Sequence, residues 1–339
     1  MEILFYLALI LLTVLAAVAP AVVYSLIVWW LDRYEKEPWG LLAATFIWGA
    51  IPAILLSLIA EFVIGVPFAA FLGQSGAEVA AGSVVAPVVE ESVKALAILA
   101  VFLIFRREFD GVLDGIVYGA LVGFGFAMTE NGLFFLGALV EGGAAMWLAL
   151  VFLRTLVFGL NHGLFSGIVG MGFGYASMAD SAWKRWLAPV VALGAAISVH
   201  AVHNLSTTLA GELCWPVVIS LLNDWGGVAI LVIIVFLSWD REKRCITEEL
   251  AGEVTAGALS QDVYDTASSY GARVSAQWKA LASFGPSGAW RVRRLHQRAT
   301  ELAFAKRRLQ RAPGDKAGER AVSRLREQIR VLQEEMAQQ

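Results

Sequence analysis

The segment VVEESVKALAI, Val88 to Ile98, places three ionisable residues in the middle of a stretch that is otherwise apolar enough to cross a membrane. Glu90 and Lys94 are four residues apart, so on a helix they share one face and can form an ion pair. Glu91 points about 100° away from Glu90. The spacing therefore predicts that Lys94 neutralises one acid while the other keeps a free chemical role.

More polar residues recur inside the other apolar stretches. Each charged residue at the centre of a membrane helix costs about 2.5–3.5 kcal/mol, so six unpaired ones would cost on the order of 15–20 kcal/mol. That exceeds the net stability of a typical domain, about 5–15 kcal/mol. We therefore expect these side chains to face one another or water. They are Glu61, Glu90, Glu91, Lys94, Glu130, Asn131, Arg154, His162, His200, His203 and Asn204.

The residue types in this set suit hydrolysis of a peptide bond inside a membrane. That reaction needs a water, a base, an acid for the leaving amine and donors for the oxyanion. We expect Lys94 and Arg154 to act as counter-ions of the carboxylates, and His203 to have a packing or supporting role. Two histidines and one glutamate can also bind zinc, so zinc is possible, although we assign no metal ligands and expect no cofactor.

Three sequence motifs of other intramembrane proteases are missing. No HExxH is present for a site-2-type zinc protease, and no GxGD of the presenilin kind. The segment GLFSG has Leu164 where a rhomboid-type GxSG would need glycine.

The elements that must position these residues are predicted to be membrane helices. The chain has 339 residues, of which 58% are hydrophobic and 16% charged, as in a polytopic membrane protein. Its two cysteines are isolated, and we expect no structural disulfide. The first apolar run lacks a basic leader and is expected to be a retained helix. We predict an all-α transmembrane bundle of about seven spans, near 3–31, 40–63, 79–105, 112–140, 146–176, 187–210 and 216–239.

Loop charges predict the orientation. Lysines and arginines follow the first, third and fifth spans, and the alternate loops contain none. By the positive-inside rule the N-terminus lies outside the cell membrane and the C-terminus in the cytoplasm. The basic loop residues are Arg33, Lys36, Arg106, Arg107, Lys184 and Arg185.

The C-terminal segment is predicted to be a separate domain. The last 101 residues hold 18 of the 26 lysines and arginines but 13 of the 29 acids, a net charge of +5. Leucines recur in a heptad row, at Leu295, Leu302 and Leu309, and a second apolar stripe ends the chain beyond the turn 312–315. We predict a membrane domain over 1–239 and, over 240–339, a cytoplasmic helical tail that contains a helical hairpin and can mediate self-association or partner binding.

Several motifs together resemble the PrsW family of intramembrane proteases, which is similar to the CAAX prenyl endopeptidase and Abi proteins. EESVK begins at Glu90, FAMTEN contains Glu130 and Asn131, and HAVHN runs from His200 to Asn204; DGIVYG and NHGLFSG lie between them. The third family motif usually has glycine before its histidine, where this chain has asparagine.

The resemblance implies proteolysis of a single-span membrane protein, such as an anti-sigma factor, in stress signalling. It implies that Glu90 or Glu91, with Glu130, activates water, that His162 completes the polar cavity, and that His200 and Asn204 stabilise the oxyanion. Two alternatives stay open: a proton- or ion-coupled transporter, and a non-catalytic membrane scaffold. The lipid bilayer is the expected surrounding, and no nucleic-acid partner is expected.

Overall fold

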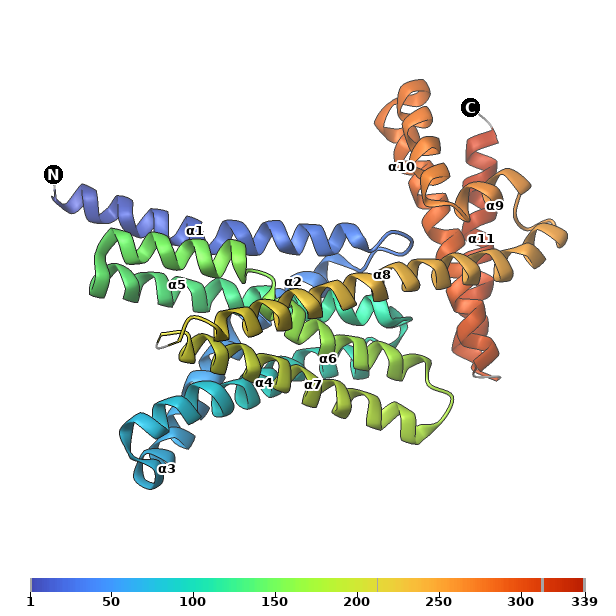
Figure 1. Cartoon of the computed structure of the whole chain (residues 1–339). Coiled ribbons are helices and arrows are strands. Elements are labelled where there is room, and N and C mark those ends of the chain that lie inside the picture. Colours follow the sequence, from blue (N-terminus) through green and yellow to red (C-terminus); the bar gives the residue numbers. More distant parts are fainter. Residues whose placement is uncertain (1, 212, 312–313, 338–339) are drawn as a thin grey trace. The chain divides into compact units, whose positions relative to one another are not determined.

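The computed structural model describes residues 2–211, 213–311 and 314–337, and every regular element in these ranges is a helix (Figure 1). The predicted all-α class is therefore confirmed. The chain divides into two compact units, each described by itself. The membrane unit comprises Met1–Leu31 and Glu37–Ile234, and the C-terminal unit comprises Asp32–Lys36 and Val235–Gln339. Cys214 and Cys245 are both free.

The membrane unit contains long helices interrupted by short π-helical and 3₁₀ segments. In chain order they are α1 (Glu2–Leu31), α2 (Trp39–Trp48), η1 (Gly49–Ala53), α3 (Ile54–Ala80), η2 (Ala81–Val85), α4 (Ala86–Ile104), η3 (Arg106–Glu108), α5 (Val112–Phe152), η4 (Leu153–Val157), α6 (Asn161–Met178), α7 (Ala182–Leu209) and α8 (Pro216–Thr255), of which the last continues into the C-terminal unit.

Five described segments are long and apolar enough to cross a membrane: Leu7–Leu31, Trp39–Gly65, Val112–Met178, Ala182–Leu209 and Pro216–Thr255. The chain is thus a multi-pass membrane protein. The third segment is not a single rod, because Gly143 has φ 68° and ψ −162° and α5 bends back on itself there (Figure 1). Helix α4, which carries Glu90, Glu91 and Lys94, is not among the five. The number of seven crossings stays a prediction.

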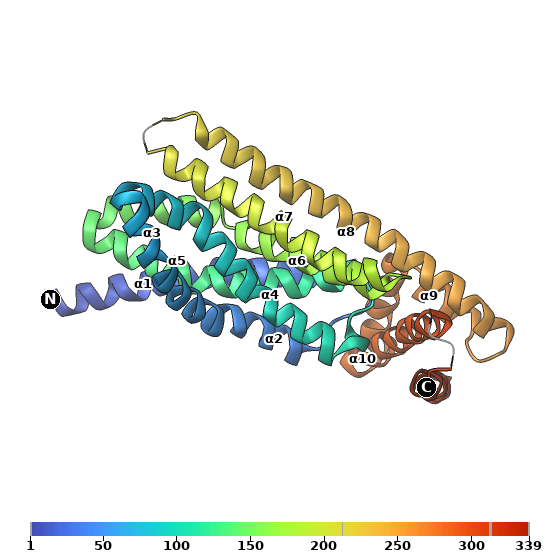
Figure 2. The same cartoon turned by 90° about the horizontal axis from the view of Figure 1, so that it is seen from below.

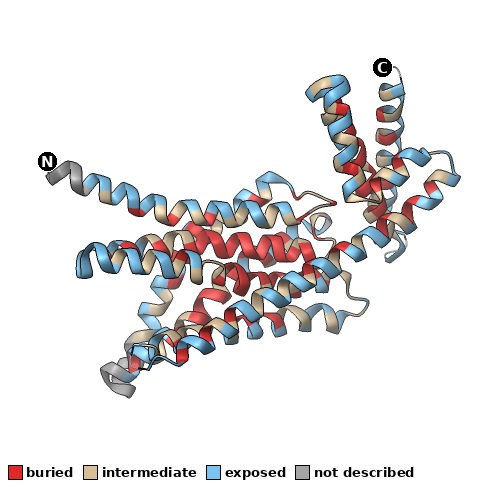
Figure 3. Cartoon of the chain, turned by 45° about the horizontal axis from the view of Figure 1, so that its top comes forward, coloured by how far each residue is buried: buried red, intermediate tan, exposed pale blue. Residues whose placement is uncertain are grey.

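A row of glycines brings α5 against α6. A side-chain carbon at Gly115 would overlap the carbonyl of Gly170, and one at Gly123 would overlap the carbonyl of His162. Only glycine allows two helix backbones to approach so closely. Helix α6 also packs against α7 (Figure 2), and the buried residues are concentrated in the middle of the unit (Figure 3). The glycine row therefore fixes the position of His162 relative to the acids of the neighbouring helices.

The C-terminal unit contains the end of α8, α9 (Gln261–Ala267), α10 (Tyr270–Arg311) and α11 (Lys316–Ala337). Helix α10 is broken at Gly285, where φ is 69°. Its second half packs against α11, and the leucines at 295 and 302 are buried there, as are Ile329 and Leu332 of α11. Residues 312 and 313 of the predicted turn lie outside the described residues.

Candidate active site

The ammonium group of Lys94 lies at the centre of the site. Lys94 is fully buried, and its Nζ donates to Glu90 Oε2 at 3.0 Å and to Glu91 Oε1 at 2.8 Å. The prediction that Lys94 would neutralise only one of the two acids is wrong. Residues three and four positions before a lysine are both its neighbours on a helix, so its long side chain reaches both carboxylates.

Helix α6 brings His162 against this ion pair and against Glu130 of α5. His162 Nδ1 is 3.1 Å from Lys94 Nζ, and His162 Nε2 is 2.9 Å from Glu130 Oε2. An ammonium group can only donate hydrogen bonds, and a carboxylate can only accept them. Nε2 therefore carries the hydrogen, and the lone pair of Nδ1 faces Lys94.

Arg154 of η4 is the counter-ion of Glu130, as predicted. Its Nη2 forms an ion pair with Glu130 Oε2, and its Nε donates to Asn131 Oδ1 at 2.6 Å. Its guanidinium carbon also lies 4.1 Å from the centre of the Phe134 ring. These contacts stabilise the ionised form of Glu130 and fix the direction in which its carboxylate points.

His200 of α7 is held by the second acid of α4. Its Nδ1 lies 3.1 Å from Glu91 Oε1, and its ring stacks on Phe165 with centres 4.5 Å apart. Glu91 is fully buried and also accepts a hydrogen bond from Ser166 at 3.1 Å. Because Glu91 already accepts from Lys94, it acts as a carboxylate, so His200 Nδ1 donates to it and Nε2 keeps its lone pair.

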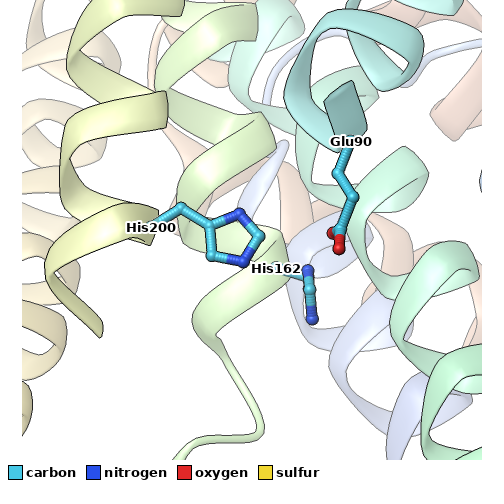
Figure 4. A group of neighbouring side chains, drawn as sticks. All are labelled: Glu90, His162 and His200. Carbon is cyan, nitrogen blue, oxygen red and sulfur yellow. The ribbon is translucent and has the colours of Figure 1, made fainter. Parts of the chain in front are cut away.

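Glu90, His162 and His200 point toward one another (Figure 4), and one donor atom from each lies within 4.8 Å of the others. Two imidazoles and a carboxylate form a known zinc-binding set. The second nitrogen of each imidazole is bonded to a further carboxylate, an arrangement typical of metal-binding histidines. The donor chemistry therefore fits a divalent metal, although the sequence alone led us to assign no metal ligands.

A cavity of about 190 Å³ opens beside this group. Its polar lining includes Glu130, Asn131, Arg154, His162, His200 and His203. Asn204 lines it too, and its amide donates to the carbonyl of Gly82 at 2.8 Å. Glu90 and Glu91 are buried beside the cavity and are not among the residues that line it. Substrate in the cavity would therefore meet Glu130 and the imidazoles.

The structure joins most of the predicted site residues in one hydrogen-bonded network. These residues are Glu90, Glu91, Lys94, Glu130, Asn131, Arg154, His162 and His200. His203 and Asn204 line the same cavity but bond elsewhere, His203 to Asp224 at 2.7 Å. Sequence reasoning included neither Ser166 nor Asp224 among the candidate site residues. Ser166 follows His162 by four residues and so shares its helix face, a signal that could have identified it.

The fold and the site together define a class: multi-pass membrane proteins that hold acids and histidines against a polar cavity within their apolar helices. Comparison with known proteins identifies the family. A model of the PrsW family of intramembrane metalloproteases matches residues 37–239, and the chain belongs to this family. The chain is therefore a protease-family protein of the membrane.

Three curated relatives are each named protease PrsW. The protein of Geobacillus kaustophilus is 34% identical over 178 residues, covering 51% of this chain and 70% of the relative. That of Bacillus subtilis is 30% identical over 180 residues, covering 51% and 72%. That of Clostridioides difficile is 39% identical over 100 residues, covering 30% and 40%. No solved structure matches the chain.

Proposed function

We propose that the chain hydrolyses a peptide bond of a single-span membrane protein with a water molecule held at Glu90, His162 and His200. One observation carries this proposal: a separate acid fixes each imidazole, Glu130 for His162 and Glu91 for His200, and one donor atom of each ring lies within 4.8 Å of the Glu90 carboxylate. Family membership favours a protease over the transporter and scaffold alternatives.

In this proposal Glu130 is the base that accepts a proton from the attacking water. Glu91 is fully buried and accepts from three donors, so it positions His200 and does not meet water. Glu130 lines the cavity, and the hydrogen bonds described above engage its Oε2, which leaves Oε1 for the water. A base must lie within hydrogen-bond reach of the proton that it accepts, and Glu130 meets this condition on the cavity side.

Glu90, His162 and His200 are the residues that would hold a divalent metal. A metal bound there would polarise the carbonyl oxygen or the attacking water. To bind a metal, His162 Nδ1 would have to give up its contact with Lys94, whose ammonium would then balance the charge of the two adjacent acids.

Asn204 is our proposed donor to the oxyanion. A side-chain amide has two N–H groups, and the bond to Gly82 uses one of them. His200 suits this role less well than the sequence suggested, because its Nδ1 hydrogen is directed to Glu91 and its Nε2 bears a lone pair.

A reporter library tests the function. Single-span proteins with varied membrane segments are co-expressed with the full chain, and cleavage is read on immunoblots. We expect wild type to cut at least one reporter, and expect Glu130→Gln, His162→Ala and His200→Ala to cut none. Glu319→Gln in α11 is the control that retains cleavage. A library left intact by wild type, or cut equally by the Glu130→Gln variant, would refute the proposal.

Metal analysis of the purified full chain tests the ligand set separately. We expect about one equivalent of a divalent transition metal in wild type and less than a tenth of that in His162→Ala and His200→Ala. Equal, near-zero metal in all three proteins, together with proteolysis that resists chelators, would assign the reaction to the glutamates alone.

We further propose that the N-terminus lies outside and the C-terminal unit in the cytoplasm, and that the substrate is a regulatory protein such as an anti-sigma factor. Cys214, in the loop between α7 and α8, is exposed, and Cys245 is buried. An impermeant maleimide should label Cys214 in intact cells. Labelling of Cys214 only after lysis would show the opposite orientation.

Single-span proteins that accumulate in membranes of the Glu130→Gln strain would identify the substrate.

A further inference from the structure

A second polar cluster lies beside the reaction centre, and the steps proposed above do not use it. Asp224 of α8 is 1% exposed. Its carboxylate oxygens lie 2.7 Å from His203 Nδ1, 3.0 Å from Asn161 Nδ2, 3.2 Å from Ser220 Oγ and 2.9 Å from Asn223 Nδ2. Buried polar groups are normally hydrogen-bonded, and the four donors around this carboxylate fix its position.

The hydrogen bonds of Asp224 determine the tautomer of His203. His203 Nδ1 lies 2.7 Å from Asp224 Oδ2, 2.8 Å from Ser220 Oγ and 3.0 Å from Asn161 Nδ2. The carboxylate can only accept, so we infer that Nδ1 donates to it, while Asn161 and Ser220 direct their own hydrogens to Asp224. Nε2 is then the nitrogen free to exchange a proton. A buried aspartate at Nδ1 orients an imidazole and stabilises the imidazolium when it forms.

His203 belongs to the same cavity as the reaction centre. Its side chain is 15% exposed and lines that cavity together with Glu130, His162 and His200. The ring of Phe165 contacts both imidazoles of α7: its centre lies 4.5 Å from that of His200 and 6.2 Å from that of His203. Phe165 thus holds the two histidines at fixed positions around one space of about 190 Å³.

Peptide hydrolysis also needs a proton for the leaving amine. Glu130 can accept the proton of water, but its ion pair with Arg154 and its bond from His162 keep it ionised before the water reacts, so a second group is needed to hold a proton ready for the amine. Lys94 is fully buried among the acids of α4. Arg154 is paired with Glu130, and His162 and His200 are assigned above to the attacking water, so His203 is the ionisable group left among the residues that line the cavity.

We propose that His203, oriented by Asp224 and protonated on both ring nitrogens before the reaction, donates its Nε2 proton to the leaving amine nitrogen; this rests on the proposed function. The water oxygen bonds to the carbonyl carbon while its proton passes to Glu130. The C–N bond then breaks, its electron pair stays on nitrogen, and nitrogen takes the proton of His203. Glu130 returns its proton to His203 through cavity water, so one water is consumed for each peptide bond cleaved.

The test compares two leaving groups. A peptide spanning the cleavage site of a reporter cut by wild type is synthesised with an amide and, separately, with an ester at the cleaved bond. General acid catalysis contributes about 10²–10⁴-fold. We therefore expect His203→Gln to slow amide cleavage by about 100-fold or more, and ester cleavage by less than about 10-fold, because an alkoxide leaves with far less help from an acid.

Matched variants separate this role from a structural one. Asp224→Asn should show the same amide-selective loss, since it acts through His203. Ser220→Ala removes a hydrogen bond but no proton carrier and should leave the amide-to-ester ratio unchanged. Glu130→Gln should lose both reactions, and His296→Gln, in the C-terminal unit, neither.

Equal losses on amide and ester in His203→Gln would assign it to packing, and no loss on either would remove it from the reaction. Both results overturn the proposal while the proposed function stands. If wild type cuts no reporter, the proposed function itself fails.

Discussion

The two units differ in the exposure of many of their charged pairs, although the C-terminal unit also buries Glu253 against Lys306 and Arg326. In the membrane unit, Lys94 and Glu91 are fully buried and each contacts several polar partners. In the C-terminal unit, a pair such as Arg244 and Asp240 leaves 65% and 58% of its side chains exposed. Exposed pairs contribute about 0–1 kcal/mol, whereas removing one partner of a buried pair costs about 3–5 kcal/mol. Because buried ion pairs are this sensitive to the loss of a partner, we attribute the burial of Lys94 and Glu91 to a function of the site.

Removing the buried cation should have the largest effect. We expect Lys94→Met to lower the free energy of unfolding by about 3–5 kcal/mol, because Glu90 and Glu91 would lose the ion pairs that compensate their burial. The unfolding of the full chain by SDS in mixed micelles, followed by circular dichroism, measures this change. An unchanged unfolding midpoint would show that the acids do not depend on Lys94.

His296 provides the next largest effect, in the C-terminal unit. Burial, with a smaller contribution from Arg273, lowers the pKa of His296 from 6.5 to about 4. Its Nδ1 has no hydrogen-bond partner among the described residues. As the pH falls, His296 is therefore protonated in the unfolded state before it is protonated in the folded state. The free energy of unfolding should decrease by about 3 kcal/mol from pH 6.5 to pH 4 and then stay constant.

Hydrogen exchange of α10 peptides in the full chain, corrected for the intrinsic rate, measures that loss. His296→Gln should flatten the pH dependence while leaving the membrane unit unaffected. The same slope in the variant would assign the titration to another group.

A smaller effect is expected from the helix contact that positions His162. A methyl group at Gly123 would overlap the backbone of α6, and overpacking costs about 1–3 kcal/mol. Gly123→Ala should lower the SDS midpoint and reduce proteolysis. Gly137→Ala on the same helix has open space around it and should be neutral or slightly stabilising. Equal behaviour of the two variants would contradict the close approach of α5 and α6.

The smallest effect is expected where an ion pair is exposed. Arg244→Met removes the pair with Asp240, and we expect a change of about 0–1 kcal/mol that shrinks further in high salt. Hydrogen exchange of α8 peptides in the full chain, at two salt concentrations, measures this change in free energy. A loss as large as that of Lys94→Met would remove the distinction between the two units.

Much of the fold could be predicted because apolar runs, turns and loop charges are local signals. The periodic leucines predicted packed helices near the C-terminus, and the buried Leu295 and Leu302 agree with that pattern. The break at Gly143 was located only approximately, as the gap between two predicted spans. The number of crossings depends on the membrane as well as on the chain, and hydropathy alone does not settle it for α4, which carries three charges.

Most of the residues that the structure gathers around the cavity could be predicted from the sequence, because an acid or histidine inside an apolar helix requires a polar partner. Tertiary structure decided the partners. Spacing along one helix suggested only the pair Glu90 and Lys94, whereas the contacts of Glu130 with His162 and of Glu91 with His200 join residues 32 and 109 positions apart. The glycine contacts of α5 and α6 set the distance between Glu130 and His162. Side-chain hydrogen bonds across helices, which no local pattern encodes, set the tautomers.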